Sequence, residues 1–185
     1  GLMVTGSHNP KPYNGLKMIL DGEVLTSEEI QDLRNQLLSD PVLPTVASKP
    51  ENTHFDIMPR YLDEMCRRLP AKKKLKVVVD AGNGVGGVVA SQLYEKLGMD
   101  VELMYCEPDG EFPNHHPNPG DPKNLEDLIA KVKTTKADVG LAFDGDGDRL
   151  GVITASGRIV WPDQLLLWMT HYLVSQGLNP TVVFD

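Results

Sequence analysis

Apolar residues recur at two spacings along the chain, and the change from one spacing to the other predicts where strands and helices lie. Positions three or four apart, as in Ile30, Leu33 and Leu37, predict amphipathic helices. Short continuous apolar runs bounded by Gly, Pro or Asp predict buried strands. The expected strands are 1–4, 16–20, 76–80, 101–105, 138–143, 150–154, 158–161 and 181–185. Two helices are expected to start at Thr26 and at Asp56. Three more are expected to span 86–97, 124–132 (capped by Asn124) and 163–176.

The order of these elements indicates an α/β fold. Strands and helices alternate from residue 76 to residue 154, which favours a mixed, mostly parallel sheet sandwiched by helices, with a hairpin at 150–161. Residues 40–54 are rich in Pro, Thr and Ser, show no periodicity and are typical of a linker at a domain boundary. The Leu, Met and Trp residues of 161–173 are expected to belong to a core. Because the chain opens within one strand-like run and closes on another, we expect an internal piece of a multi-domain protein.

Composition narrows the classes of function. With 185 residues, 41% of them hydrophobic, the chain is long enough to bury a core without disulfides. Its 26 acidic and 18 basic residues give a net charge of −8, which argues against binding nucleic acid or an anionic membrane. No apolar run reaches the ~18 residues of a membrane-spanning helix, and no signal peptide is recognisable. Cys66 and Cys106 lack the spacing of a metal or redox motif, so we expect a cytoplasmic protein.

The densest group of acidic residues lies in the sequence DGDGDR at 144–149. Asp144, Asp146 and Asp148 follow directly after a predicted strand, and ligands of open α/β sheets bind at the carboxyl ends of strands. Three carboxylates this close repel one another unless a cation lies among them. Oxygen ligands favour Mg²⁺ or Ca²⁺. The motif therefore predicts a metal site, with a solvated acidic turn as the alternative.

Arg149 distinguishes this motif from a calcium-binding EF-hand. It stands at the sixth position of such a loop, where glycine is required, and Ala155 stands where the final glutamate belongs. A guanidinium beside a metal cluster suits phosphate chemistry instead, because it pairs with two phosphate oxygens at once.

A second polar turn, TGSHNP at 5–10, carries a candidate nucleophile. Ser7 lies between Gly and Pro residues, His8 is its neighbour, and Lys17 follows ten positions later. A serine hydroxyl acts as a nucleophile or phosphoryl carrier only when nearby groups manage its proton and charge, and His8 or Lys17 can do so. An ordinary polar turn is the alternative, since neither an acyl-transfer triad nor a GxSxG elbow is present.

A glycine-rich turn offers a competing hypothesis. Residues 82–87 (GNGVGG) match the GxGxxG pattern between a predicted strand and a predicted helix, and Asp100 follows near the distance of a ribose-binding acid. A dinucleotide-binding domain is therefore an alternative. A turn that needs glycine only for close packing explains the same pattern.

The loop at 109–119 carries two adjacent histidines, His115 and His116, among three prolines. Their side chains can bind metal or phosphate. Adjacent residues rarely bind one ion, however, so we expect the loop to have a structural role beside the site.

Taken together, these motifs resemble those of a known enzyme family. Residues 5–10 resemble the phosphoserine loop of the α-D-phosphohexomutases, and residues 144–149 resemble their metal loop. The sequences NGLK at 14–17 and FPNHHP at 112–117 are similar to the phosphomannomutase/phosphoglucomutase branch. The resemblance covers essentially the whole chain and implies parts of three domains: the end of domain 1 (1–52), domain 2 (53–157) and the start of domain 3 (158–185).

The resemblance also implies a mechanism. It implies that Ser7 carries a phosphoryl group and joins the three aspartates in binding Mg²⁺, while His8, Lys17 and Arg149 manage protons and charge. The implied reaction moves phosphate between O1 and O6 of mannose or glucose phosphate, with hexose 1,6-bisphosphate as intermediate and activator. The sugar-binding loops of domains 3 and 4 are not recognisable here, so the chain alone is expected to be poorly active. A Mg²⁺-binding regulatory or interaction module, with Ser7 idle, is the remaining alternative.

Overall fold

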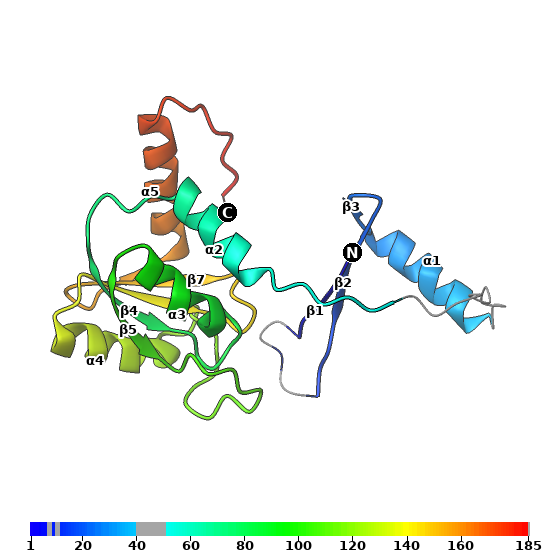
Figure 1. Ribbon diagram of the computed structural model, residues 1–185, viewed down its shortest axis with the longest axis horizontal. Helices are drawn as coiled ribbons and strands as arrows, with labels where there is room; N and C mark the ends of the chain where they lie inside the picture. The colour runs from blue at the N-terminus through cyan, green and yellow to red at the C-terminus, as the bar shows by residue number, and fades with distance from the viewer. Residues whose placement is uncertain (7–8, 10–11, 40–50, 185) are drawn as a thin grey trace.

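Two sheets organise the described part of the chain, which comprises residues 1–6, 9, 12–39 and 51–184 of the computed structural model. One is a small antiparallel sheet of three strands near the N-terminus. The other has five strands and forms the centre of a helix–sheet–helix arrangement (Figure 1).

The small sheet positions the N-terminal loop. β1 (Leu2–Val4) pairs antiparallel with β2 (Leu16–Leu20), which pairs with β3 (Glu23–Val24). Just beyond the paired strands, the amide of Thr5 donates to the Gly15 carbonyl at 3.0 Å. This bond holds the two ends of the loop that connects β1 and β2 next to each other. The ends of this polar loop are therefore fixed by the hydrogen bonds of a hairpin.

The first helix begins as its sequence predicts. α1 (Ser27–Leu38) opens with a capping box, in which the Thr26 hydroxyl accepts from the Glu29 amide and the Glu29 carboxylate accepts from the Thr26 amide. These two bonds satisfy backbone groups that a helix end otherwise leaves unpaired.

The five-stranded sheet has the order β5-β4-β6-β7-β8. Its strands are β4 (Lys76–Asp80), β5 (Asp100–Met104), β6 (Val139–Phe143), β7 (Leu150–Thr154) and β8 (Ile159–Val160). β4 pairs parallel with β5 and β6, whereas β6, β7 and β8 form an antiparallel meander. The predicted mixed α/β sheet is confirmed, and α3 (Gly86–Lys96) makes the crossover between the parallel neighbours β4 and β5.

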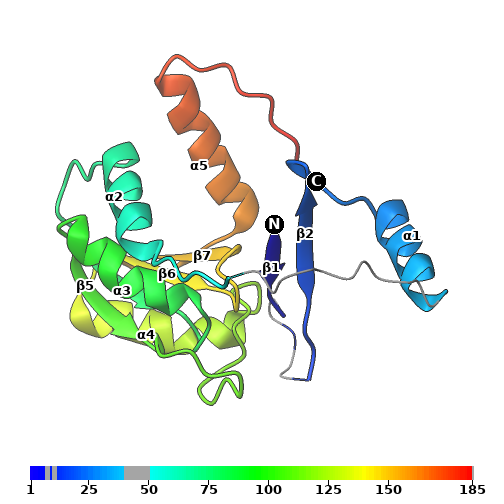
Figure 2. The same cartoon turned by 45° about the vertical axis from the view of Figure 1, so that its right-hand side comes forward.

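Alternating valines of β4 bury both faces of this sheet. Val77 and Val79 pack with Ala90 of α3 (Gly86–Lys96) on one face. Val78 packs on the other face with Leu128 and Val132 of α4 (Glu126–Thr135). α2 (Met58–Arg68) lies against α3, as Figure 2 also shows. Because side chains alternate along a strand, one central strand supplies both cores.

The predicted cap of the fourth helix is wrong. A short 3₁₀ turn, η1 (Pro122–Leu125), precedes α4, and Asp121 caps it by accepting from the amide of Lys123 at 3.0 Å. Pro122 favours this start because a first-turn residue needs no amide hydrogen. Asn124 instead donates through its side-chain amide to the carbonyl of Asn118.

Two predictions for the C-terminal part are also wrong. Residues 181–184 form no strand, because no other described strand pairs with them, and Asp185 lies outside the described residues. α5 (Pro162–Ser175) was expected to be core, yet Trp168 and Met169 are 49% and 51% exposed. Figure 2 shows α5 projecting away from the sheet, so its outer face has no core surface of the described chain to pack against. Along the same described ranges, no helix combines the length and apolar character needed to span a membrane.

Candidate active site

The three aspartates of the DGDGDR sequence converge at the carboxyl end of β6. One carboxylate oxygen from each of Asp144, Asp146 and Asp148 lies within 4.8 Å of the others. The turn closes through the amide of Gly147, which donates to the Asp144 carbonyl at 3.1 Å, and Gly147 has a φ of 74°. Glycine adopts this left-handed conformation without steric cost. The predicted clustering of the three carboxylates is thus present in the structure.

The environment of the three carboxylates differs sharply. Asp144 is fully buried, the Asp146 side chain is 8% exposed, and the Asp148 side chain is 57% exposed. Burial raises the pKa of Asp144, but hydrogen bonds from the Arg149 amide and guanidinium and the positive charge of Arg149 outweigh it and lower the pKa below its usual value. Asp144 is therefore held as a carboxylate in the interior.

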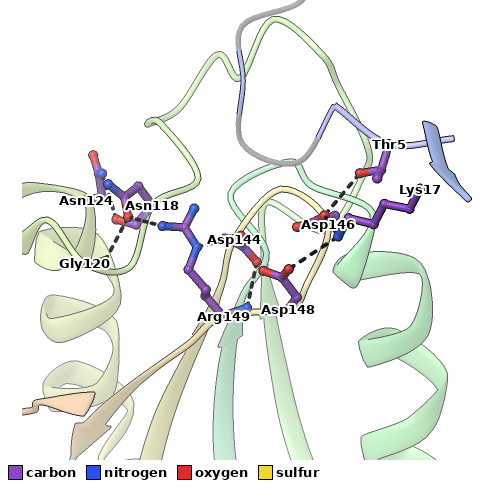
Figure 3. Close-up of polar contacts among 9 residues, drawn as sticks. All are labelled: Thr5, Lys17, Asn118, Gly120, Asn124, Asp144, Asp146, Asp148 and Arg149. Carbon is purple, nitrogen blue, oxygen red and sulfur yellow. Dashed lines mark hydrogen bonds and ion pairs between the residues drawn. The ribbon is translucent and has the colours of Figure 1, made fainter. Parts of the chain in front are cut away.

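Two cations contact this acidic cluster. The Arg149 Nε donates to Asp144 Oδ2 at 2.9 Å, and its amide donates to Oδ1 at 3.0 Å. Lys17 Nζ lies 3.4 Å from Asp146 Oδ2 and 3.7 Å from Asp148 Oδ2 (Figure 3). Each carboxylate oxygen of Asp144 still has a second lone pair. An all-oxygen donor set that converges in this way fits a hard divalent cation such as Mg²⁺.

The N-terminal loop reaches the same cluster. The hydroxyl of Thr5 donates to Asp146 Oδ2 at 3.2 Å, across 141 positions of sequence (Figure 3). Ser7 and His8, the predicted nucleophile and its neighbour, lie outside the described residues. On their far side, the amide of Asn9 donates to the Gly6 carbonyl at 3.0 Å. Thr5 is therefore tied to the DGDGDR turn, and Gly6 and Asn9, which flank the two residues outside the description, are bonded to each other.

A cavity lies beside this contact. Its volume is about 410 Å³, and it is bounded by the N-terminal loop and by loops that follow the strands of the larger sheet. Lining residues from these loops include Thr5, Tyr13, Asn83, Phe112 and Asp146. This volume lies within the ordinary range of small-molecule sites.

One nitrogen of the Arg149 guanidinium makes no hydrogen bond within the described chain. Its Nη1 donates to Asn118 Oδ1 at 3.3 Å, and its Nε is taken by Asp144. Its Nη2 is buried and has no hydrogen-bond partner among the described residues. An unsatisfied buried donor costs about 1–3 kcal/mol, and no described residue offsets this cost at Nη2.

The glycine-rich turn at 82–87 is a packing turn. A Cβ added to Gly84 would lie 2.8 Å from the Gly145 carbonyl oxygen, and one added to Gly87 would collide with the backbone of Cys106. The amide of Val85 donates to Gly145 at 3.0 Å, so it serves the metal loop. A pyrophosphate site instead needs exposed amides at such a turn. This geometry does not support the dinucleotide alternative.

Sequence reasoning missed three residues beside the site: Thr5 and Asn118 as hydrogen-bonding partners, and Asp80. Asp80 ends β4, is fully buried, and lies within 3.0 Å of His115 Nε2. His115 also packs edge-on against Tyr105, in keeping with the structural role expected of its loop. The sequence did contain a signal for Asp80. This aspartate lies at the carboxyl end of a predicted buried strand, as Asp144 does, and such positions favour a site residue.

Comparison with protein families gives two matches along the chain. Residues 59–157 match the model "Phosphoglucomutase/phosphomannomutase, alpha/beta/alpha domain II". Residues 1–41 match the model of domain I of the same description.

Curated proteins and solved structures agree with these matches. The chain is 51% identical over its whole length to a phosphomannomutase/phosphoglucomutase of Pseudomonas aeruginosa and covers 39% of that protein. It is 46% identical to a phosphoglucomutase of Neisseria meningitidis, of which it covers 40%. A crystal structure of a phosphoglucomutase/phosphomannomutase family protein from Burkholderia thailandensis superimposes with a TM-score of 0.87 at 42% identity, covering 95% of this chain and 38% of that one. The chain thus spans about two fifths of the length of these relatives.

Proposed function

Because the chain belongs to the phosphoglucomutase/phosphomannomutase family, we propose that it supplies the phosphoryl-carrying loop and the metal loop of a mutase acting on mannose or glucose phosphate. The reaction moves phosphate between O1 and O6 of the hexose. The names of the relatives from Pseudomonas and Neisseria support the choice of sugar phosphates. The domain division at 1–52, 53–157 and 158–185 is part of the same proposal.

One contact carries the proposal. The Thr5 hydroxyl binds Asp146 only two positions before Ser7, so the TGSHNP loop starts at the acidic cluster. A serine used as phosphoryl carrier needs a concentration of positive charge at that point. The cluster of three carboxylates provides the ligands for a cation, and Lys17 and Arg149 supply two fixed charges beside it.

The proposed step transfers one phosphoryl group. The bond between phosphorus and Ser7 Oγ breaks as phosphorus bonds to a free hydroxyl oxygen of the hexose phosphate. The proton of that hydroxyl passes to a base, for which we propose His8 or Lys17. A hexose 1,6-bisphosphate results. The bisphosphate then reorients in the site, and Ser7 Oγ bonds to the phosphorus of the other phosphoryl group as the bond from that phosphorus to the sugar oxygen breaks. The base returns its proton to that sugar oxygen, and the phosphate has changed position.

The remaining residues bind and hold charge. We propose Asp144, Asp146 and Asp148, with a phosphoserine oxygen, as ligands of Mg²⁺. When bound, Mg²⁺ offsets negative charge on the phosphoryl group during transfer. We propose that Arg149 Nη2, the buried donor without a partner among the described residues, binds a phosphate oxygen.

The phosphoryl carrier is tested by intact mass spectrometry of the freshly purified chain, before and after phosphatase treatment, with peptide mapping. We expect one phosphatase-sensitive phosphoryl increment on the peptide that holds Ser7. The Ser7→Ala variant should lose this increment, and the matched Ser27→Ala variant at the start of α1 should keep it. A phosphoryl group that persists in Ser7→Ala, or that maps to another residue, would overturn the assignment.

A further inference from the structure

A second strand-end carboxylate lies beside the site and is not used in the proposed transfer. Asp80, the last residue of β4, is fully buried. Its Oδ1 accepts from the amide of Gly82 at 2.9 Å. His115 Nε2 lies 3.0 Å from Oδ2 and 3.2 Å from Oδ1. A buried carboxylate needs partners of this kind, since leaving one unpaired costs several kcal/mol.

Both ring nitrogens of His115 face acceptors. Nε2 meets the Asp80 carboxylate, and Nδ1 lies 3.1 Å from the carbonyl oxygen of His116. A neutral imidazole has one N–H and can donate to only one of them, whereas an imidazolium donates to both. The geometry therefore favours a protonated ring at this position.

The groups around His115 come from three elements. Asp80 belongs to β4, Tyr105 follows β5 and contacts the ring edge-on at a centroid distance of 5.5 Å, and Asp127 on α4 accepts from the Tyr105 hydroxyl at 3.0 Å. The hydrogen bond to Asp80 raises the pKa of His115, against the opposing effect of burial, and the charges of Asp80 and Asp127 act in the same direction as the bond.

The His116 carbonyl links this pair to the active site. It also accepts from the amide of Asn118 at 2.8 Å. Asn118 Oδ1 in turn accepts from Arg149 Nη1 at 3.3 Å, and the Arg149 Nε donates to Asp144 (Figure 3). One continuous set of hydrogen bonds therefore runs from the buried carboxylate of β4 to the buried carboxylate of the metal loop.

We propose that His115 is a positioning residue for Arg149. Protonated and bound to Asp80, it holds the His116 carbonyl in place, and this fixes Asn118 against the guanidinium. When the ring loses its proton, one of its two hydrogen bonds is lost, and Asn118 no longer holds Arg149 firmly beside Asp144. The hydrogen bonds that carry this proposal do not depend on the proposed mutase reaction. Only the consequence for phosphate binding through Arg149 rests on the proposed function.

A pH titration of the wild-type chain by NMR tests this link. The chain is labelled with ¹⁵N, and the resonances of the His115 ring nitrogens and of Arg149 Nε are recorded from about pH 5 to 9. Arg149 Nε is detected through its attached carbon. The pH range spans histidine titration. We expect the Arg149 resonance to shift with the same midpoint as the His115 ring. An Arg149 resonance that stays constant while His115 titrates overturns the proposal.

Two variants locate the path. In Asn118→Ala, His115 should titrate as before, while the Arg149 shift falls to less than about a third of its wild-type size. In His115→Gln, that shift should vanish, whereas His171→Gln on α5 should leave it unchanged. An Arg149 response that persists in Asn118→Ala would overturn the route through Asn118. If His115→Gln fails to fold, the titrations of the wild type and of Asn118→Ala still test whether His115 is coupled to Arg149 through Asn118. None of these readouts needs Ser7 phosphorylation or turnover, so failure here is distinct from failure of the proposed function.

Discussion

Lys17 Nζ and Asp146 Oδ2 lie 3.4 Å apart although 129 positions separate the two residues in sequence. The lysine comes from β2 of the small sheet, and the aspartate comes from the turn after β6. The Lys17 side chain is 56% exposed, whereas that of Asp146 is 8% exposed. The small sheet therefore presents a solvated cation to a largely buried carboxylate of the larger sheet's loop.

This contact makes Lys17 a competitor of a metal ion in the resting chain. Replacing Lys17 by Met should raise Mg²⁺ affinity by a few-fold, because an exposed ion pair contributes about 0–1 kcal/mol and its loss leaves the carboxylates more negative. Isothermal titration calorimetry measures the change. Lys73→Met, in the exposed turn before β4, should leave the affinity unchanged. A weaker Mg²⁺ affinity in Lys17→Met would show that Lys17 supports the metal site.

Removing the charge of Asp146 should weaken Mg²⁺ binding, which is the opposite of the effect expected for Lys17→Met. In Asp146→Asn, we expect Mg²⁺ affinity to fall by about tenfold or more, since one of three converging carboxylates loses its charge. The fold should stay intact, because the side chain lies at the edge of the core. Circular dichroism checks the fold and calorimetry checks the binding, with Asp32→Asn on α1 as control. Wild-type affinity in Asp146→Asn would remove Asp146 from the ligand set.

The turn that gathers three carboxylates after β6 was predictable because its signals are local. A short apolar run predicts β6, and alternating Gly and Asp residues directly after it predict a turn that gathers carboxylates. The capping box at Thr26 and Glu29 is equally local and is confirmed by the structure. Such features depend on residues within one turn of each other, so no tertiary knowledge is needed to find them.

The misplaced helix cap at Asn124 is a local failure, since Asp121 and Pro122 start the turn three residues earlier. The other failures depend on partners that periodicity does not specify. The apolar spacing of α5 shows that a face can be buried but not what covers it, and the strand expected at 181–185 has no described partner. The pair formed by Asp80 and His115 spans 35 positions. Only the folded sheet brings a strand end and a later loop together, so residue type alone did not reveal that pair.

The close contact between the glycine-rich turn and the metal loop gives a prediction about Gly84. In Gly84→Ala, the new methyl group meets the Gly145 carbonyl oxygen at 2.8 Å and must push the metal loop away. We expect a loss of about 1–3 kcal/mol in unfolding free energy, together with weaker Mg²⁺ binding. Gly86→Ala is the matched control, because its methyl group meets Phe143 at an ordinary 3.4 Å. Urea unfolding measures both variants, and equal stabilities would contradict the predicted clash.

Stability should fall as the pH rises through the titration of His115. The pKa of His115 is raised in the folded chain, chiefly by its hydrogen bond to Asp80, above the value of about 6.5 of an unfolded histidine. Folding therefore favours the protonated ring. Its contribution is complete below the unfolded pKa and is lost as the pH rises through the folded pKa.

Urea unfolding of wild type and His115→Gln at several pH values measures this contribution. The wild-type midpoint, relative to that of the variant, should be higher near pH 6 than near pH 9. Replacing the exposed His54 by Gln should retain the wild-type pH dependence. A difference between wild type and His115→Gln that is constant with pH would mean that the ring contributes packing alone, since only a group whose protonation changes on folding makes stability depend on pH.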